Sequence, residues 1–242
     1  MLLKLENVTK RFGGLVAVNK LDLEVEEGEA LGIVGPNGSG KTTLYNLISG
    51  VYIPDEGKII FEGKDITNLP PHKRAPLGLA RTFQIPRPFG SASVRENVAI
   101  GAMFGRAHAG VDEALEMADE YLKIVGIYEL RNKEAKLLTP LEKKLMELAR
   151  ALAMKPKLLL LDELLAGMNP KDIDKIIDLI KRVKEEENIA VVSMVEHLMH
   201  AITKFAERVV VMHQGRKLLE GPTIEVLNHP EVIEVYLGGR VV

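Results

Sequence analysis

The stretch from Gly35 to Thr42 constrains the fold more than any other part of the chain. It reads GPNGSGKT and fits the pattern G-x-x-x-x-G-K-[ST] at every position. A short apolar run at 30–34 precedes it and a helical pattern follows, so the predicted order is buried strand, loop, helix. Backbone N–H groups of such a loop, together with the helix N-terminus, form a cradle for phosphate. An ordinary glycine-rich turn is the alternative, and it does not explain the flanking context.

Two side chains of this loop carry specific predicted roles. The Lys41 ammonium is expected to face the β- and γ-phosphates of a nucleotide, and the Thr42 hydroxyl is expected to bind Mg²⁺. The predicted nucleotide-binding residues of the loop are Gly35, Pro36, Asn37, Gly38, Ser39, Gly40, Lys41, Thr42 and Thr43.

A second motif supplies acidic groups. Four leucines at 158–161 suit a strand that is buried on both faces, and they are followed by Asp162 and Glu163. Such a strand places Asp162 at its C-terminal end, where ligands of α/β sheets bind. We predict that Asp162 helps to hold Mg²⁺ and that Glu163 orients or deprotonates the attacking water. The alternative is a pair that caps the helix predicted at 171–185.

The pattern along the chain predicts an α/β fold. Residues 2–9 and 16–26 alternate apolar and polar side chains, as half-buried antiparallel strands do, and Gly13 and Gly14 mark the turn between them. Later segments of helical period alternate with short apolar runs, which predicts a mostly parallel sheet with helices on both faces. The predicted strands of this part are 157–161, 189–193 and 208–212.

The middle of the chain departs from that alternation. Helical periods at 112–125 and 142–154 follow one another with no strand between them, and 104–110 has the character of a loop. We therefore predict a nucleotide-binding core formed by 1–86 and 156–242, with a helical subdomain inserted at 87–155.

Composition excludes several classes of protein. The 242 residues include 32 Lys and Arg against 34 Asp and Glu, so bulk positive charge for nucleic acid is absent. The chain has no cysteine, which excludes disulfides and thiolate metal sites. It also lacks a run of about 18 apolar residues and a signal-peptide pattern. We expect a cytoplasmic protein that meets a membrane only through partner subunits.

Taken in order, five motifs resemble those of the nucleotide-binding subunit of ABC transporters, over nearly the whole chain. GPNGSGKTT is similar to the Walker A motif, LLLLDE to Walker B, RTFQ to the Q-loop, AGMNP to the D-loop and VEH to the H-loop. The segments RFGGL, ARTFQ and EGPTIEVLNHPEVIEVYLG are most similar to the ATPases of branched-chain amino acid importers. The resemblance implies a P-loop ATPase with ATP and Mg²⁺ as ligands and with an N-terminal antiparallel β subdomain.

The resemblance also implies roles that spacing alone does not give. Phe12 would stack on adenine with Val18 packed nearby, although Phe12 as a simple core residue is the alternative. Gln84 would bind Mg²⁺ and the attacking water, and His197 would contact the γ-phosphate. The D-loop residues would be Ala166, Gly167, Met168 and Asn169. The groove that couples to the permease would lie near 85–97.

One segment departs from the family. Where these proteins usually have LSGGQ, this chain has Leu138, Thr139, Pro140, Leu141 and Glu142. Proline removes an N–H and leucine adds bulk where glycines would approach the partner's nucleotide. A capping box with proline at the first helical position explains the same residues structurally. Leu164 and Leu165 add apolar side chains near the expected dimer interface, and these are either compensated in the fold or mark a site that closes abnormally.

These observations lead to three functional hypotheses. The first is an importer ATPase that works with a second ABC ATPase, two membrane permease subunits and an extracytoplasmic solute-binding protein, on the inner face of the cell membrane. A heterodimer is favoured over a homodimer, because a partner with an intact signature would complete this chain's site. The second is a regulatory or assembly subunit that binds ATP with little hydrolysis. The third is a soluble ABC ATPase of DNA repair or translation. The chain lacks the long coiled coil, the second ATPase copy and the excess of basic residues expected of such a protein.

Overall fold

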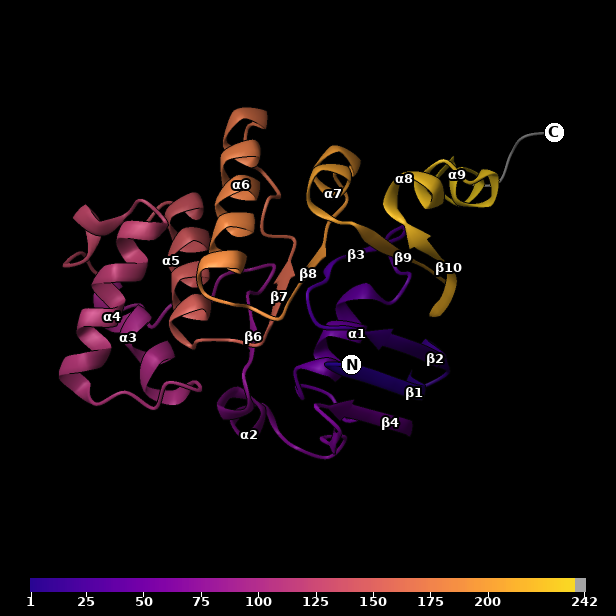
Figure 1. Cartoon of the computed structure of the whole chain (residues 1–242), viewed down its shortest axis with the longest axis horizontal. Coiled ribbons are helices and arrows are strands. Elements are labelled where there is room, and N and C mark those ends of the chain that lie inside the picture. The colour runs from indigo at the N-terminus through magenta and orange to yellow at the C-terminus, as the bar shows by residue number, and fades with distance from the viewer. Residues whose placement is uncertain (238–242) are drawn as a thin grey trace. The chain divides into compact units, whose positions relative to one another are not determined.

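The computed structural model describes residues 1–237, which form two compact units. The first unit joins Met1–Pro70 to the part of the chain from Ala190 onward, and the second is Pro71–Ile189. Figure 1 shows the elements of both. Within the described part, no helix is both long and apolar enough to cross a membrane.

The first unit begins with an antiparallel sheet. Strands β1 (Leu3–Phe12) and β2 (Leu15–Val25) form a hairpin, and β4 (Glu56–Phe61) pairs with the other edge of β1. The short strand β5 (Lys64–Asp65) extends the sheet beyond β4. Buried leucines alternate with exposed or half-buried polar residues along β1, which is why one face of the hairpin joins the core. The two predicted N-terminal strands are confirmed.

Parallel strands form the centre of the first unit. Strand β3 (Ala30–Val34) lies between β8 (Val191–Val195) and β9 (Arg208–His213) and is parallel to both. All residues of β3 and β8 are buried, as expected of strands covered on both faces. The antiparallel strand β10 (Arg216–Pro222) adds to the edge of β9. The helices of this unit are α1 (Lys41–Ile48), α7 (Met199–Phe205), α8 (Thr223–Leu227) and α9 (Pro230–Leu237).

The second unit joins two parallel strands to a set of helices. Strands β6 (Leu79–Arg81) and β7 (Leu158–Asp162) pair in parallel. Its helices are α2 (Pro71–Arg74), α3 (Val94–Phe104), α4 (Val111–Ile124), α5 (Pro140–Ala153) and α6 (Pro170–Glu186), with short 3-10 turns at Ala75–Leu77, Tyr128–Leu130 and Ala135–Leu137. Helices α3, α4 and α5 pack against one another. A Cβ on Gly101 of α3 would lie 2.2 Å from the Arg150 carbonyl oxygen of α5, so glycine permits this close packing.

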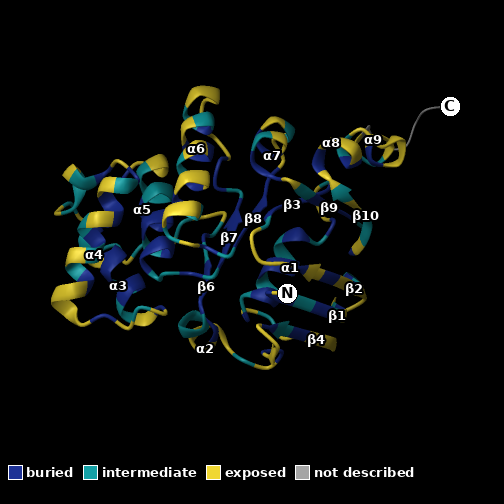
Figure 2. Cartoon of the chain, viewed as in Figure 1, coloured by how far each residue is buried: buried dark blue, intermediate teal, exposed yellow. Residues whose placement is uncertain are grey.

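The predicted helices and strands are confirmed within a few residues. Helix α6 carries the predicted apolar stripe on one side only, and its other side is exposed (Figure 2). The loop predicted at 104–110 connects α3 and α4, and 87–155 contains helices and turns without a named strand among its described residues. The division into a core and a helical subdomain at 87 and 155 stays a prediction.

Candidate nucleotide-binding and catalytic site

The loop after β3 packs so closely against its neighbours that two glycines are required. A Cβ on Gly35 would lie 2.2 Å from the Met212 carbonyl oxygen, and one on Gly40 would lie 2.3 Å from the Ala17 carbonyl oxygen. Both glycines have positive φ, of 148° and 103°, a region that other residues rarely adopt. Gly40 is also the N-cap residue of α1, which begins at Lys41. The loop is therefore held tightly against the first unit and ends at a helix N-terminus.

The polar side chains of this loop suit an anion. The Lys41 Nζ donates to the carbonyl oxygens of Gly35 and Pro36, at 2.8 and 3.0 Å, so its charge lies over the loop. The Ser39 Oγ is buried and makes no hydrogen bond within residues 1–237. A buried hydroxyl without a hydrogen bond lowers the stability of the fold, and a bound ligand that accepts its hydrogen bond would remove that cost. A cation, a hydroxyl and backbone N–H groups at a helix N-terminus together fit a nucleotide phosphate.

The aromatic residue at the end of β1 lies on the surface. Phe12 is 42% exposed, and its ring centroid lies 5.2 Å from that of Tyr52 in an edge-to-face arrangement. The Lys10 ammonium lies 5.7 Å from the same ring. The alternative that Phe12 is a simple core residue is wrong, whereas Val18 is fully buried. An exposed ring that contacts a second aromatic side chain is able to stack on a base. Stacking of Phe12 on adenine stays a prediction.

Asp162 ends β7 and forms a buried ion pair. Its Oδ2 accepts a hydrogen bond from the Arg81 Nη2 at 2.7 Å, with the two side chains 1% and 5% exposed. The neighbouring Thr82 Oγ1 accepts from the Asp162 backbone N–H at 3.2 Å. Asp162 thus lies at the end of its strand as predicted. Arg81 was not among the predicted site residues, and it compensates the charge of Asp162.

Glu163 and Gln84 meet in the second unit. The Gln84 Nε2 donates to the Glu163 Oε2 at 2.6 Å, although 79 residues separate them. The Glu163 backbone has φ of 48°, in the left-handed region, which costs roughly 1–2 kcal/mol for a residue other than glycine. The alternative that Asp162 and Glu163 cap α6 is wrong, because Asn169 caps it by accepting from the Asp172 N–H at 3.0 Å. Two side chains predicted for the catalytic site therefore lie in direct contact.

The unusual segment before α5 forms the predicted capping box. The Thr139 Oγ1 accepts from the Glu142 N–H at 3.3 Å, and a Glu142 carboxylate oxygen accepts from the Thr139 N–H at 2.7 Å. Pro140 occupies the first helical position. The hydrogen bond from the Thr139 N–H is the main cause that lowers the pKa of Glu142. Leu138 is buried and Leu141 is 38% exposed.

Loss of the cap should lower stability. We expect Thr139→Ala to reduce the free energy of unfolding by about 1 kcal/mol, the usual value for an N-cap threonine. Thr203→Ala is the matched control, because the Thr203 hydroxyl donates to the Met199 carbonyl inside α7 and caps no helix; we expect a change within about 0.5 kcal/mol. Chemical denaturation followed by circular dichroism measures both. Equal effects from the two substitutions would contradict a role for the cap.

Leu164 and Leu165 do not enlarge the exposed apolar surface. They are 2% and 0% exposed, so both side chains are buried. Their burial agrees with compensation in the fold, and abnormal closure of the site stays a prediction. The following D-loop residues Ala166 and Gly167 are exposed, Met168 is half-buried, and Asn169 begins α6.

His197 belongs to the first unit. It lies between β8 and α7 with its side chain exposed, and the preceding Glu196 is buried. The structure places it at the end of a parallel strand that neighbours β3, the strand before the phosphate loop. Its contact with a γ-phosphate stays a prediction.

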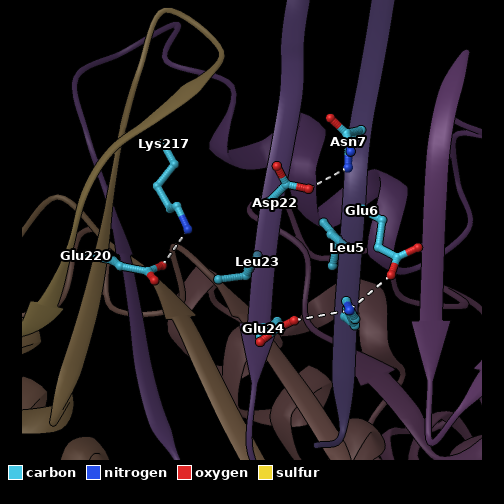
Figure 3. Close-up of a pocket in the computed structure, with 9 residues that line it drawn as sticks. Leu5, Glu6, Asn7, Asp22, Leu23, Glu24, Lys217 and Glu220 are labelled. Carbon is cyan, nitrogen blue, oxygen red and sulfur yellow. Dashed lines mark hydrogen bonds and ion pairs between the residues drawn. The ribbon is translucent and has the colours of Figure 1, made fainter.

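A pocket away from these motifs is lined by more carboxylates than lysines, and both lysines form ion pairs. About 420 Å³ in volume, it lies beside β1, β2 and β10 (Figure 3). Lys4 pairs with Glu6 and Glu24 at 3.0 and 3.2 Å, and Lys217 pairs with Glu220 at 2.9 Å. No residue of the phosphate loop lines it. It is separate from the candidate nucleotide site.

Comparison with known proteins agrees with this arrangement. The family model "ABC transporter" matches residues 18–166, and the model "Branched-chain amino acid ATP-binding cassette transporter" matches 216–242. A probable branched-chain amino acid transport ATP-binding protein, LivG, of Archaeoglobus fulgidus is 39% identical, over 99% of this chain and 96% of the relative. The high-affinity branched-chain amino acid transport ATP-binding protein BraF of Pseudomonas aeruginosa is 36% identical, over 98% of each.

Solved structures agree as well. A nucleotide-free ATP-binding cassette from an ABC transporter superposes with a TM-score of 0.82 at 32% identity, over 98% of this chain and 99% of the other. A dimeric cassette in a post-hydrolysis state with ADP and Pi gives 0.83 at 27% identity, over 91% and 98%. The chain therefore belongs to the ATP-binding cassette family of ABC transporters.

Proposed function

We propose that this chain is the ATP-binding and ATP-hydrolysing subunit of an ABC importer for branched-chain or related amino acids. The observation that carries the proposal is the Gln84–Glu163 contact of 2.6 Å in a chain that also has a complete phosphate loop. A protein that only binds nucleotide does not need a general base such as Glu163, held in contact with a glutamine that can orient water. The named transport relatives support the same choice over a regulatory subunit.

The residues of the site divide the work of hydrolysis. Phe12 stacks on the adenine, while the loop N–H groups and Lys41 bind the phosphates. Glu163 accepts a proton from the attacking water, which Gln84 helps to orient. His197 contacts the γ-phosphate. Binding of the phosphates at the loop fixes them for in-line attack, so most of the catalysis comes from positioning and charge.

Thr42, Gln84 and Asp162 are the proposed residues for Mg²⁺. A hydroxyl, an amide oxygen and one carboxylate suit this hard cation, which keeps several waters and needs few protein ligands. Among the described residues, no three or more His, Cys, Asp or Glu side chains are grouped so that they could hold a metal ion. When bound, Mg²⁺ neutralises charge on the phosphates.

The segment Leu138–Glu142 supports a heterodimer. In the family each site borrows the partner's signature, but here Pro140 has no N–H, Leu141 exposes an apolar side chain, and Glu142 keeps its negative charge. All three features oppose contact with phosphate. We propose that this chain's own phosphate loop meets the intact signature of a second cassette, while the partner's nucleotide meets Leu138–Glu142 and turns over slowly.

Exposed apolar side chains support a permease partner. Ile85 and Phe89, in the segment after Gln84, are 76% and 54% exposed. Single exposed apolar residues are common, but two in the segment that follows a catalytic glutamine suit a docking site for a membrane subunit. We propose that two permease subunits hold the chain at the inner face of the membrane, with a solute-binding protein outside.

Hydrolysis by the purified chain tests the proposal. We expect the parent to bind Mg²⁺-ATP tightly and hydrolyse it slowly, and the Pro140→Gly, Leu141→Gly double variant to hydrolyse it up to about a hundredfold faster, the scale for regaining phosphate donors. Leu137→Gly, which adds a glycine outside the segment, is the control and should leave the rate unchanged.

The outcomes separate the hypotheses. If the parent and the double variant hydrolyse ATP at the same rate, the signature segment does not limit the reaction. If both bind ATP and neither hydrolyses it, even with a second cassette that carries LSGGQ, the chain is not a motor subunit.

A further inference from the structure

Lys144, on the second turn of α5, contacts the turn that follows the catalytic strand. Its Nζ donates to the carbonyl oxygens of Glu163 at 3.0 Å, Leu164 at 3.0 Å and Ala166 at 2.7 Å. An ammonium group has three N–H donors, and these three acceptors all come from one short segment. The Lys144 side chain thus fixes the backbone of the turn that carries the Glu163 side chain.

That turn needs an external partner. Glu163 has a left-handed backbone, with φ of 48°. The turn's own hydrogen bonds are modest, from the Ala166 N–H to the Glu163 oxygen at 3.3 Å and from the Met168 N–H to the Leu165 oxygen at 3.1 Å. Three carbonyl oxygens directed toward one point also repel one another unless a cation lies between them. The Lys144 charge removes that repulsion.

The same helix holds the glutamine that contacts Glu163. Glu147, one turn after Lys144 and 1% exposed, accepts from the Phe83 N–H at 2.8 Å and the Arg87 N–H at 3.3 Å. These N–H groups flank Gln84. Burial raises the pKa of Glu147, and the hydrogen bonds oppose that shift. Helix α5 therefore holds both sides of the Gln84–Glu163 contact. The Glu147 carboxylate holds the backbone that flanks Gln84, and the Lys144 ammonium holds the backbone of Glu163.

We propose that Lys144 is a positioning residue for hydrolysis, which sets the Glu163 carboxylate from the helix that carries the altered signature segment. The proposal rests on the proposed function, because it assigns Glu163 the role of base. Lys144 is proposed to act through the backbone of Glu163, Leu164 and Ala166, to whose carbonyl oxygens its ammonium donates. A change in the position of the Lys144 ammonium would then move the backbone of Glu163.

Two readouts on the full chain test this role. We expect Lys144→Met to lower kcat for ATP hydrolysis about 10- to 100-fold, as a small misplacement of a catalytic group does, while KM for ATP stays within about twofold. Lys144→Arg should recover most of the rate, because its guanidinium also donates to carbonyls. By hydrogen exchange, the Ala166 and Met168 amides should exchange at least about tenfold faster in Lys144→Met.

Lys143→Met is the matched control. Lys143 precedes Lys144 on the same helix, and its ammonium makes no hydrogen bond or ion pair in the described part of the chain, so kcat and exchange should stay at parental values. Unchanged kcat or unchanged exchange in Lys144→Met would overturn the proposal. A parent that binds ATP but never hydrolyses it would contradict the proposed function alone, and the exchange rates would then decide whether Lys144 holds the turn.

Discussion

Glu163→Gln should lower the rate of ATP hydrolysis by about 10²- to 10⁴-fold, the range for loss of a general base. The substitution keeps the size of the side chain, and the new amide oxygen can still accept from the Gln84 Nε2. Only the ability to take a proton is lost. ATP affinity should change little, because the phosphate loop and Lys41 are untouched. Steady-state hydrolysis and an ATP-binding titration, in the parent and in the Pro140→Gly, Leu141→Gly background, measure both quantities.

An exposed carboxylate outside the site provides the control for that experiment. Glu185 is exposed on α6, and Glu185→Gln should leave hydrolysis at the parental rate. If Glu163→Gln retained a third or more of the parental kcat, another group would be the base. A large loss of ATP affinity in the same variant would instead indicate that Glu163 acts in nucleotide binding.

Arg81→Met should reduce the free energy of unfolding by about 3–5 kcal/mol, the cost of removing one member of a buried ion pair. The substitution leaves Asp162, which is 1% exposed, with a buried charge. For a chain of this length the loss corresponds to a fall in Tm of roughly 6–20 °C. Chemical denaturation and calorimetry measure the two quantities.

An exposed ion pair is the matched control for Arg81. Arg182 and Glu186 lie 4.0 Å apart on α6 with side chains that are 60% and 61% exposed, so Arg182→Met should cost less than about 0.5 kcal/mol. If Arg81→Met also cost less than about 1 kcal/mol, the Arg81–Asp162 pair would contribute little and solvent would reach Asp162.

Local sequence patterns were sufficient for most of the secondary structure and for the site motifs. The capping box at Thr139 follows from residues three apart, and the glycines of the phosphate loop follow from a fixed spacing. The four leucines of β7 identify a strand buried on both faces. In each case, the physical cause acts between residues that are close in the chain.

Contacts between distant segments could not be predicted in this way. Arg81 and Asp162 are 81 residues apart, and Lys144 is 19 from Glu163, so nothing in the neighbourhood of any of them signals the pairing. Strand β6 was not predicted, because its three residues are too few to show an alternation of apolar and polar side chains. Leu164 and Leu165 are apolar whether they face the core or a partner, and only the packed structure shows that they face the core.

The Arg81 guanidinium is a permanent counter-ion of the Asp162 carboxylate, supplied by the chain itself. The guanidinium compensates the charge of this buried acid from within the fold. If Asp162 holds Mg²⁺ as proposed, the ion would compete with the Arg81 guanidinium for the same carboxylate. Under that assignment, binding of Mg²⁺ at Asp162 would depend on movement of the Arg81 side chain.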